Sequence, residues 1–515
     1  FLLKFARRSL KYASSVFKML MNVLRSLPFP SMGLGGRPGR PSVMTAQPST
    51  ARGCSGEVEL QPGAELSLGQ QKFRILHLLG RGSFSAVWTA LRLDGGGEVA
   101  IKETVCHSLD GLKDAENESK ILQMVGNAGL RTSGFVACET VQLRSGKTSV
   151  RLAMAKVSGD SLGTFLEQRK KERFGDPSSQ FVEACNFTYE LLVQLVPTFE
   201  AISAVALHRD INTHNVLVSV GGWGSIPQFS IIDFGLAIDV QSWQTMLTKV
   251  PVVGDCRYWP VSAWYIFAHG AKLMEVQSLF TEYRTQLDLH AFGITALQFF
   301  MDLLPRQSRA IPGEIWALKA AWDQYWLDAY RLWEPLYKAF EGKADFEAVR
   351  RSYMANEAHS IIDKDLEHLR RSLCNARDAF AQAEPGSKGS VIFSILAELI
   401  SQGAKPLGRE AATSSIKLAS WGHIADLLNN ASSRRGSTTT ALGCNSSSTT
   451  LQLPIQSKLH GTTSTLAPSP TTTHIPPSFA VCGSPVNCAT PVSSPTMVIS
   501  GATSFSQRPL VPVLR

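Results

Sequence analysis

The stretch "LHRDINTHNVLV" at residues 207–218 decides how the rest of the chain is interpreted. It sets Asp210 and Asn215 directly before an apolar run. A second stretch, "IIDFG" at 231–235, sets Asp233 directly after an apolar run. Each aspartate alone is an ordinary turn former or helix cap. The three side chains indicate a functional site only when they are considered together with the ordered motifs on either side of them.

Upstream, short β-rich runs alternate with glycine turns. They are "KFRILHLLG" (72–80), "SAVWTALRL" (85–93), "EVAIKETV" (98–105) and "SVRLAMAKV" (149–157), with the helical stretch "LKDAENESKILQMVG" (112–126) between the last two. This pattern predicts a mostly antiparallel sheet with one main helix, and the chain becomes mainly helical beyond residue 180. We therefore expect an α+β, bilobal fold, with a small β-rich lobe, a larger α-helical lobe and a cleft between them.

Taken in order, the motifs resemble those of the eukaryotic protein kinase family over residues 73–300. "LGRGSFSAV" (79–87) resembles the family's glycine-rich loop, and "VAIK" (99–102) resembles its lysine-bearing strand. The resemblance implies a protein kinase that uses ATP and Mg²⁺ and transfers the γ-phosphoryl group to a protein hydroxyl. Serine or threonine is the expected acceptor.

The resemblance also implies the roles of the residues in the opening stretch. Asp210 would orient the substrate hydroxyl and accept its proton. Asn215 and Asp233 would hold Mg²⁺, which neutralises charge on the transferred phosphoryl group.

A further set of roles concerns residues outside that stretch. Lys102 would orient the α- and β-phosphates, with Glu118 as its ion-pair partner in preference to Glu116. "DLHAFG" (288–293) resembles a helix of the large lobe, in which Asp288 would brace the backbone of the catalytic loop.

Several positions depart from the family's pattern. Asn212 stands where a lysine that reaches the γ-phosphate is expected, and His214, when protonated, would supply part of the missing charge. Ser85 replaces a glycine of the glycine-rich loop, and Val261 and Ser262 stand where a Pro-Glu pair is expected. One lost electrostatic contact typically costs about 10²–10³ in rate, so reduced but measurable activity is expected.

The resemblance places the adenine against "LAMAKVSGDSLGTFL" (152–166). Met154 is the expected gatekeeper, and the main chain of Ala155 and Val157 would hydrogen-bond the base. Without the resemblance these are ordinary core residues, which is compatible with the first interpretation. The expected nucleotide-binding residues are Leu79, Gly80, Gly82, Ser83, Phe84, Val87, Ala100, Lys102, Met154, Ala155, Val157 and Leu217.

The stretch "GDCRYWP" (254–260) resembles the end of the family's activation segment, and regulation is expected at this segment. The guanidinium of Arg209 would pair bidentately with a phosphate on Thr245 or Thr248. This pairing would make activity depend on phosphorylation.

Charge and composition divide the chain into segments. Residues 1–56 hold nine basic and no acidic residues, residues 403–515 hold eight and two, and residues 57–402 retain 34 basic and 40 acidic residues. We predict a basic amphipathic segment (1–27), a linker (28–56), a kinase domain (57–402) and a disordered Ser/Thr/Pro-rich tail (403–515). The net positive charge belongs to the ends, so no nucleic-acid partner is expected.

Two of these segments leave alternatives open. Residues 312–384 form an atypical helical region whose aromatic residues indicate core packing, with a partner-binding helix pair as the alternative. Residues 2–27 fit contact with an anionic membrane surface, an organelle transit peptide, or a helix packed on the domain. Scattered cysteines favour a reducing compartment. The expected localisation is cytoplasmic, with membrane association or organelle targeting as alternatives.

Two other classes of function fit the same motifs. A pseudokinase scaffold would bind ATP or partners with little or no catalysis, and Asn212, Ser85 and the missing Pro-Glu pair favour it. A small-molecule kinase of related fold would share the loop and the metal-binding aspartate. It would not be expected to keep Arg209 and an activation segment. Transfer to protein or to small-molecule acceptors separates these classes.

Overall fold

The computed structural model describes residues 59–81, 85–126, 130–171, 176–221, 225–246, 252–305, 311–340, 343–383, 386–400 and 419–439 of the 515-residue chain. All of them belong to one compact unit, Phe1–Cys444. The predictions for residues 1–56, for Gly82, Ser83 and Phe84, for Thr248, and for the chain beyond residue 439 lie outside the described residues.

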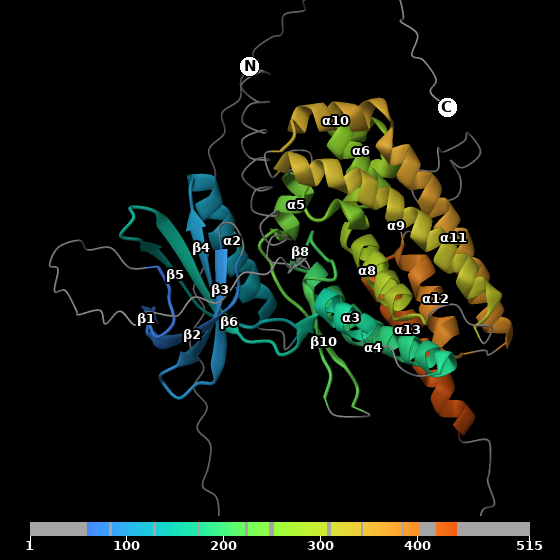
Figure 1. Ribbon diagram of the computed structural model, residues 1–515, viewed down its shortest axis with the longest axis horizontal. Helices are drawn as coiled ribbons and strands as arrows, with labels where there is room; N and C mark the ends of the chain where they lie inside the picture. Colours follow the sequence, from blue (N-terminus) through green and yellow to red (C-terminus); the bar gives the residue numbers. More distant parts are fainter. Residues whose placement is uncertain are drawn as a thin grey trace, which may run out of the picture. The chain divides into compact units, whose positions relative to one another are not determined.

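The small lobe is built on an antiparallel sheet with the strand order β1-β2-β3-β4-β6-β5 (Figure 1). Its strands are β1 (Glu65–Leu68), β2 (Gln71–Arg81), β3 (Ser85–Arg92), β4 (Glu98–Cys106), β5 (Phe135–Gln142) and β6 (Thr148–Ala155). Helix α2 (Leu109–Gly126) packs against β4, β5 and β6. The predicted sheet and helix are confirmed. Strand β4 is buried along almost its whole length, because α2 packs against it and because Val99 and Ile101 lie in a second apolar cluster that includes Phe73.

Short paired strands flank the loop that contains residues 208–215. Strand β9 (Val216–Ser219) pairs with β10 (Gln228–Ile231) and with β7 (Asp160–Ser161), and β8 (Ala206–Leu207) pairs with β11 (Ile238–Asp239). The residues between β8 and β9 therefore form a loop fixed at both ends, and the residues between β10 and β11 form a second one beside it.

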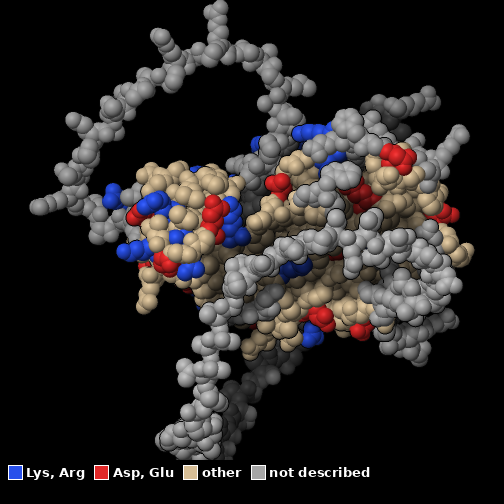
Figure 2. All heavy atoms as spheres, turned by 90° about the horizontal axis from the view of Figure 1, so that it is seen from below, with Lys and Arg blue, Asp and Glu red and all other residues tan. Residues whose placement is uncertain are grey.

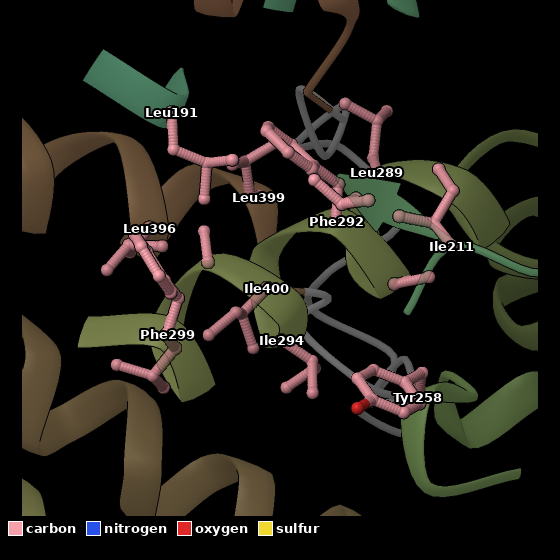
Figure 3. Packing of buried hydrophobic residues seen from close by; sticks show 14 of the residues in the cluster. Leu191, Ile211, Tyr258, Leu289, Phe292, Ile294, Phe299, Leu396, Leu399 and Ile400 are labelled. Carbon is pink, nitrogen blue, oxygen red and sulfur yellow. The ribbon is translucent and has the colours of Figure 1, made fainter. Parts of the chain in front are cut away.

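The large lobe packs around helix α8 (Leu287–Leu303), which is buried on nearly all sides. A helix that is apolar all round belongs in the centre of a domain. Figure 3 shows Phe292, Ile294 and Phe299 of α8 against residues of α12 (Lys388–Leu399) and α4 (Pro177–Ser203). A Cβ at Gly293 would lie 2.8 Å from that of Leu399, so the glycine permits this close approach.

Further helices complete the large lobe. Helix α3 (Leu162–Lys171) packs on α8, and α5 (Val240–Met246), η2 (Cys256–Tyr258), α6 (Val261–His269), η3 (Gly270–Glu275) and α7 (Gln277–Thr285) follow the second loop. Helices α9 (Gly313–Phe340), α10 (Phe346–Ala355) and α11 (Ala358–Ala383) form the atypical region. Trp322 and Leu336 of α9 are buried, as the expectation of core packing requires.

The predicted boundary of the domain at residue 402 is wrong. Helix α13 (Trp421–Thr439) packs against α4 and α12. Trp421, Ile424 and Leu428 lie on one face of this helix and are buried, and the Trp421 ring stacks on Phe199 at 5.1 Å. The surrounding Ser- and Thr-rich composition masks this short apolar pattern, so composition alone placed it in a disordered tail.

Charge on the small lobe is mixed. Figure 2 shows basic and acidic side chains interspersed over the face that is visible there. Among the described residues, no helix combines the length and the apolar character that a membrane crossing requires.

Candidate active site

Lys102, in the middle of β4, forms ion pairs both within the small lobe and with the loop that follows β10. Its ammonium lies 2.7 Å from Glu118 Oε1 of α2 and 2.9 Å from Asp233 Oδ1, which follows β10. The Lys102 and Glu118 side chains are buried. Burial alone would lower the pKa of Lys102, but the two carboxylates outweigh it and hold that pKa above its ordinary value. The ion pair fixes α2 against the sheet.

The choice between the two glutamates of α2 is settled by their neighbours. Glu116 accepts a hydrogen bond from the Thr140 hydroxyl at 3.4 Å and is not the partner of Lys102. At Gly235, an added Cβ would lie 3.1 Å from Asp233 Oδ1 and 3.2 Å from Lys102 Nζ. The glycine therefore leaves room for the ion pair.

Asp210 accepts hydrogen bonds from both its own loop and the activation segment. Asn212 Nδ2 donates to its Oδ1 at 3.0 Å, and Asn215 Nδ2 donates to its Oδ2 at 2.8 Å. The main-chain N–H of Asp255 donates to Oδ1 at 3.2 Å. Burial, together with the charges of Asp233 and Asp255, raises the pKa of Asp210 to about 8. A carboxyl group with this pKa is mostly protonated at pH 7, and a cation such as Mg²⁺ bound nearby would favour the ionised form that can accept a proton.

The departures in the loop have structural consequences. Asn212 is buried, donates to Asp210, and accepts a hydrogen bond from the His214 main-chain N–H at 2.8 Å. Burial and the charge of Arg257 lower the pKa of His214, so its ring is neutral at pH 7. A positive charge on His214, which was expected only for its protonated form, is therefore disfavoured at neutral pH.

Asp233 and Asn215 are suited to a hard metal ion. Burial raises the pKa of Asp233, but Lys102 and the N–H of Gly235 outweigh it, so the net pKa is lowered and the group is ionised. The N–H of Ile232 donates to the main-chain oxygen of Asn215 at 2.9 Å, which ties the two loops together. No cluster of three or more His, Cys, Asp or Glu side chains able to hold a metal occurs in the described parts of the chain. Mg²⁺ commonly takes one or two protein oxygens and completes its shell with phosphates and water, so this donor set fits it.

The expected adenine-binding residues come from strands β2, β3, β4, β6 and β9 and from the segment after β6. Ala100 of β4 lies opposite Met154 of β6, and Val87 of β3 lies opposite Lys102. Leu217 of β9 pairs with Ser161. The side chains of Val87, Ala100, Met154 and Leu217 are buried or half-buried, whereas Ala155 is exposed.

Residues 155–157, at the end of β6 and after it, contain the main-chain groups that were expected to hydrogen-bond the base. The N–H of Ala155 donates to the Gly134 oxygen at 2.7 Å, so in this arrangement it does not face a base. Leu79 is 48% exposed at the end of β2, and Gly80 pairs with Val87.

The catalytic loop is braced from below by α8. Asp288 accepts from the N–H of His208 at 2.7 Å and from that of Arg209 at 2.8 Å, as expected. These bonds hold Arg209 at φ 67°, and Asp233 has φ 66°. Such left-handed backbone is uncommon for residues other than glycine and gathers at functional sites. The Phe234 ring is buried 4.9 Å from His208.

Two of the three residues expected to act in regulation, Arg209 and Thr245, lie within the described part of the chain. The Arg209 guanidinium lies over the Trp243 ring at 5.7 Å. Thr245 is exposed, and its hydroxyl donates to the Gln241 oxygen at 2.9 Å. Phosphate pairing with Arg209 stays a prediction.

Sequence reasoning missed a replacement at the end of the activation segment. Where the Pro-Glu pair is absent, the N–H of Ser262 donates to the buried Glu282 carboxylate at 2.7 Å. Glu282 thus caps the first turn of α6 from α7. No motif marks this residue, because it lies 20 positions downstream.

Comparison with known proteins agrees with this geometry. A family model described as protein kinase domain matches residues 73–364, and so reaches into the atypical region. Serine/threonine-protein kinase dkf-1 of Caenorhabditis elegans is 30% identical over 187 residues, which cover 35% of this chain and 23% of that protein. Serine/threonine-protein kinase PLK4 of Xenopus tropicalis is 26% identical over 180 residues, covering 34% and 17%. The chain thus spans less than a quarter of the length of these curated relatives.

Proposed function

The chain belongs to the eukaryotic protein kinase family, and we propose that it is an active kinase that transfers the γ-phosphoryl group of ATP to a serine or threonine hydroxyl of a protein. The observation that carries this proposal is the double ion pair of Lys102 with Glu118 and Asp233. Phosphoryl transfer depends mainly on positioning and charge stabilisation, and this pair is what positions the phosphates.

The reaction follows from the placement of the side chains. Lys102 would contact the α- and β-phosphates, and Asp233 and Asn215 would hold Mg²⁺, whose charge would neutralise that of the phosphate oxygens. Asp210 accepts the proton of the acceptor hydroxyl as its oxygen bonds to the γ-phosphorus. The bond from that phosphorus to the bridging oxygen breaks, and ADP leaves. Asp210 must be ionised to accept this proton, a form that the charge of bound Mg²⁺ would favour, and its raised pKa then helps it to hold the proton.

Serine or threonine as the acceptor is supported by the relatives, whose names describe serine/threonine-protein kinases. The catalytic loop itself does not mark the acceptor, because Asn212 replaces the lysine expected there. Phosphoamino-acid analysis of the products identifies the acceptor directly.

A pseudokinase scaffold is the second candidate, and the neutral pair Asn212 and His214 favours it. The two candidates predict different results for the full-length chain incubated with Mg-ATP labelled at the γ-phosphate. Label on the chain or on added protein substrates, absent in Asp210→Asn, supports the kinase. Binding of Mg-ATP without any transfer to protein would establish the scaffold, and transfer only to small molecules would establish a different kinase class.

A further inference from the structure

The end of the activation segment is tied to a helix of the atypical region. Asp255 and Arg257 form an ion pair in which Arg257 Nε lies 3.0 and 3.1 Å from the two carboxylate oxygens, and Nη2 lies 2.5 Å from one of them. Both side chains are largely buried, at 4% exposure for Asp255 and 14% for Arg257. A buried, bidentate pair of this kind holds a fixed geometry.

Helix α9 encloses the guanidinium of this pair. The Arg257 guanidinium lies 4.7 Å from the Trp333 ring centroid and 5.4 Å from that of Trp326. The Tyr325 hydroxyl donates to the Arg257 main-chain oxygen at 3.0 Å. Stacking on two indole rings is favourable for a guanidinium and restricts where it can lie.

The other end of the same chain of contacts reaches the reacting groups. The N–H of Asp255 donates to Asp210 Oδ1, and Gly254 precedes it with φ 92°. A Cβ at Gly254 would lie 2.4 Å from the Arg209 oxygen, so segment and catalytic loop are in close contact here. The Asp255 carboxylate also accepts from the Arg257 N–H at 3.0 Å, which fixes the turn that presents the Asp255 amide.

We propose that Arg257, held between Trp326 and Trp333 of α9, is a positioning residue that keeps the Asp255 amide on the catalytic carboxylate of Asp210. The atypical helix α9 is then part of the machinery that aligns the proton acceptor. The effect on turnover rests on the proposed kinase function, whereas the effect on the Asp255 amide does not.

The test compares full-length wild type with Arg257→Gln, which removes the charge, and Arg257→Lys, which keeps it. Trp333→Leu removes the stacking ring, and Leu327→Ala, at an exposed position of the same helix, is the control. Three quantities are measured: kcat, the Kd of Mg-ATP, and hydrogen exchange of peptides covering residues 252–260.

Arg257→Gln and Trp333→Leu should lower kcat about 10- to 100-fold, since small misplacements of reacting groups have effects of this size. Both variants should speed hydrogen exchange at Asp255, and Arg257→Lys should show smaller changes in kcat and in exchange than Arg257→Gln. The Kd of Mg-ATP should stay unchanged in these variants. Leu327→Ala should match wild type in all three quantities. Unchanged exchange and kcat in Arg257→Gln would overturn the proposal, as would a loss of Mg-ATP binding equal to the loss of kcat. If wild type transfers nothing, the kinase proposal fails, and exchange at Asp255 alone then decides the positioning role.

Discussion

The amide of Asn212 donates to the carboxylate of Asp210 at 3.0 Å. A lysine at this position would keep a donor beside Asp210 and add a charge near the γ-phosphate. Asn212→Lys is therefore expected to raise kcat about tenfold or more while the Kd of Mg-ATP changes little, because the added charge acts mainly in the transition state. Asn212→Met is the matched control, because methionine is similar in length to lysine but carries no charge. A lysine variant no faster than the methionine variant would show that charge at this position does not limit turnover.

Asp210 and Asp233 should fail in different ways. Asp210→Asn keeps the shape but cannot accept the proton, so transfer should fall about 10³-fold or more with nucleotide binding intact. Asp233→Asn removes a metal-binding charge and the partner of Lys102, so Mg-ATP binding itself should weaken. Steady-state kinetics and nucleotide titration separate the two. Equal effects of both variants on binding would contradict the assignment.

Helix α13 should be necessary for stability. Trp421→Ala removes a buried ring that stacks on Phe199, and should lower the free energy of unfolding by about 3–5 kcal/mol. Leu327→Ala, at an exposed site, should change it by less than about 0.5 kcal/mol. Urea unfolding of the full-length variants measures both. A fragment that ends at residue 402 should be destabilised for the same reason, and equal stability of that fragment would count against the packing of α13.

Stability should fall on acidification because of His290. Burial lowers its pKa to about 3 in the folded chain, against an ordinary value of 6.5. Below pH 6.5 the unfolded chain binds a proton that the folded chain does not. This contribution is present above pH 6.5 and is lost by about 1.4 kcal/mol per pH unit as the pH falls toward 3. Unfolding of wild type and His290→Gln across pH 4–8 isolates it, and parallel curves would refute it.

The basic segment at residues 2–27 should bind vesicles that contain anionic lipid, with binding weakened by salt. At helical spacing, six basic residues of this segment are predicted to fall on one face, and they motivate the expectation: Lys4, Arg7, Arg8, Lys11, Lys18 and Arg25. A variant with all six changed to Gln is the control in a co-sedimentation assay. Equal binding to neutral and anionic vesicles would exclude an electrostatic anchor, and cleavage on import into an isolated organelle would point to a transit peptide instead.

The sequence predicted the sheet, the two lobes and the residues of the catalytic loops, because motif order and periodicity are local properties. The pairing of Lys102 with Glu118 was also predicted, from the resemblance of this helix to the family's pattern, and the structure confirms it. Each of these predictions needs only residues close in sequence or a known order of motifs.

Contacts that depend on packing could not be predicted. The neutral state of His214 depends on Arg257, which lies 43 positions away in sequence and close to it in space. Trp326 and Trp333 were predicted to pack in the core, and they do pack against it while half-buried, but the sequence did not show that they also contact the Arg257 guanidinium. Helix α13 was missed because three apolar residues stand in a polar segment.

Arg209 and Asp233 both hold left-handed backbone, which costs about 1–3 kcal/mol each. Folded domains usually have only about 5–15 kcal/mol in reserve. A kinase with this loop geometry therefore tolerates fewer destabilising substitutions elsewhere before the folded fraction falls. Variants at core positions away from the site, such as those of α13, would then reduce the amount of folded protein in a cell while leaving the properties of each folded molecule unchanged.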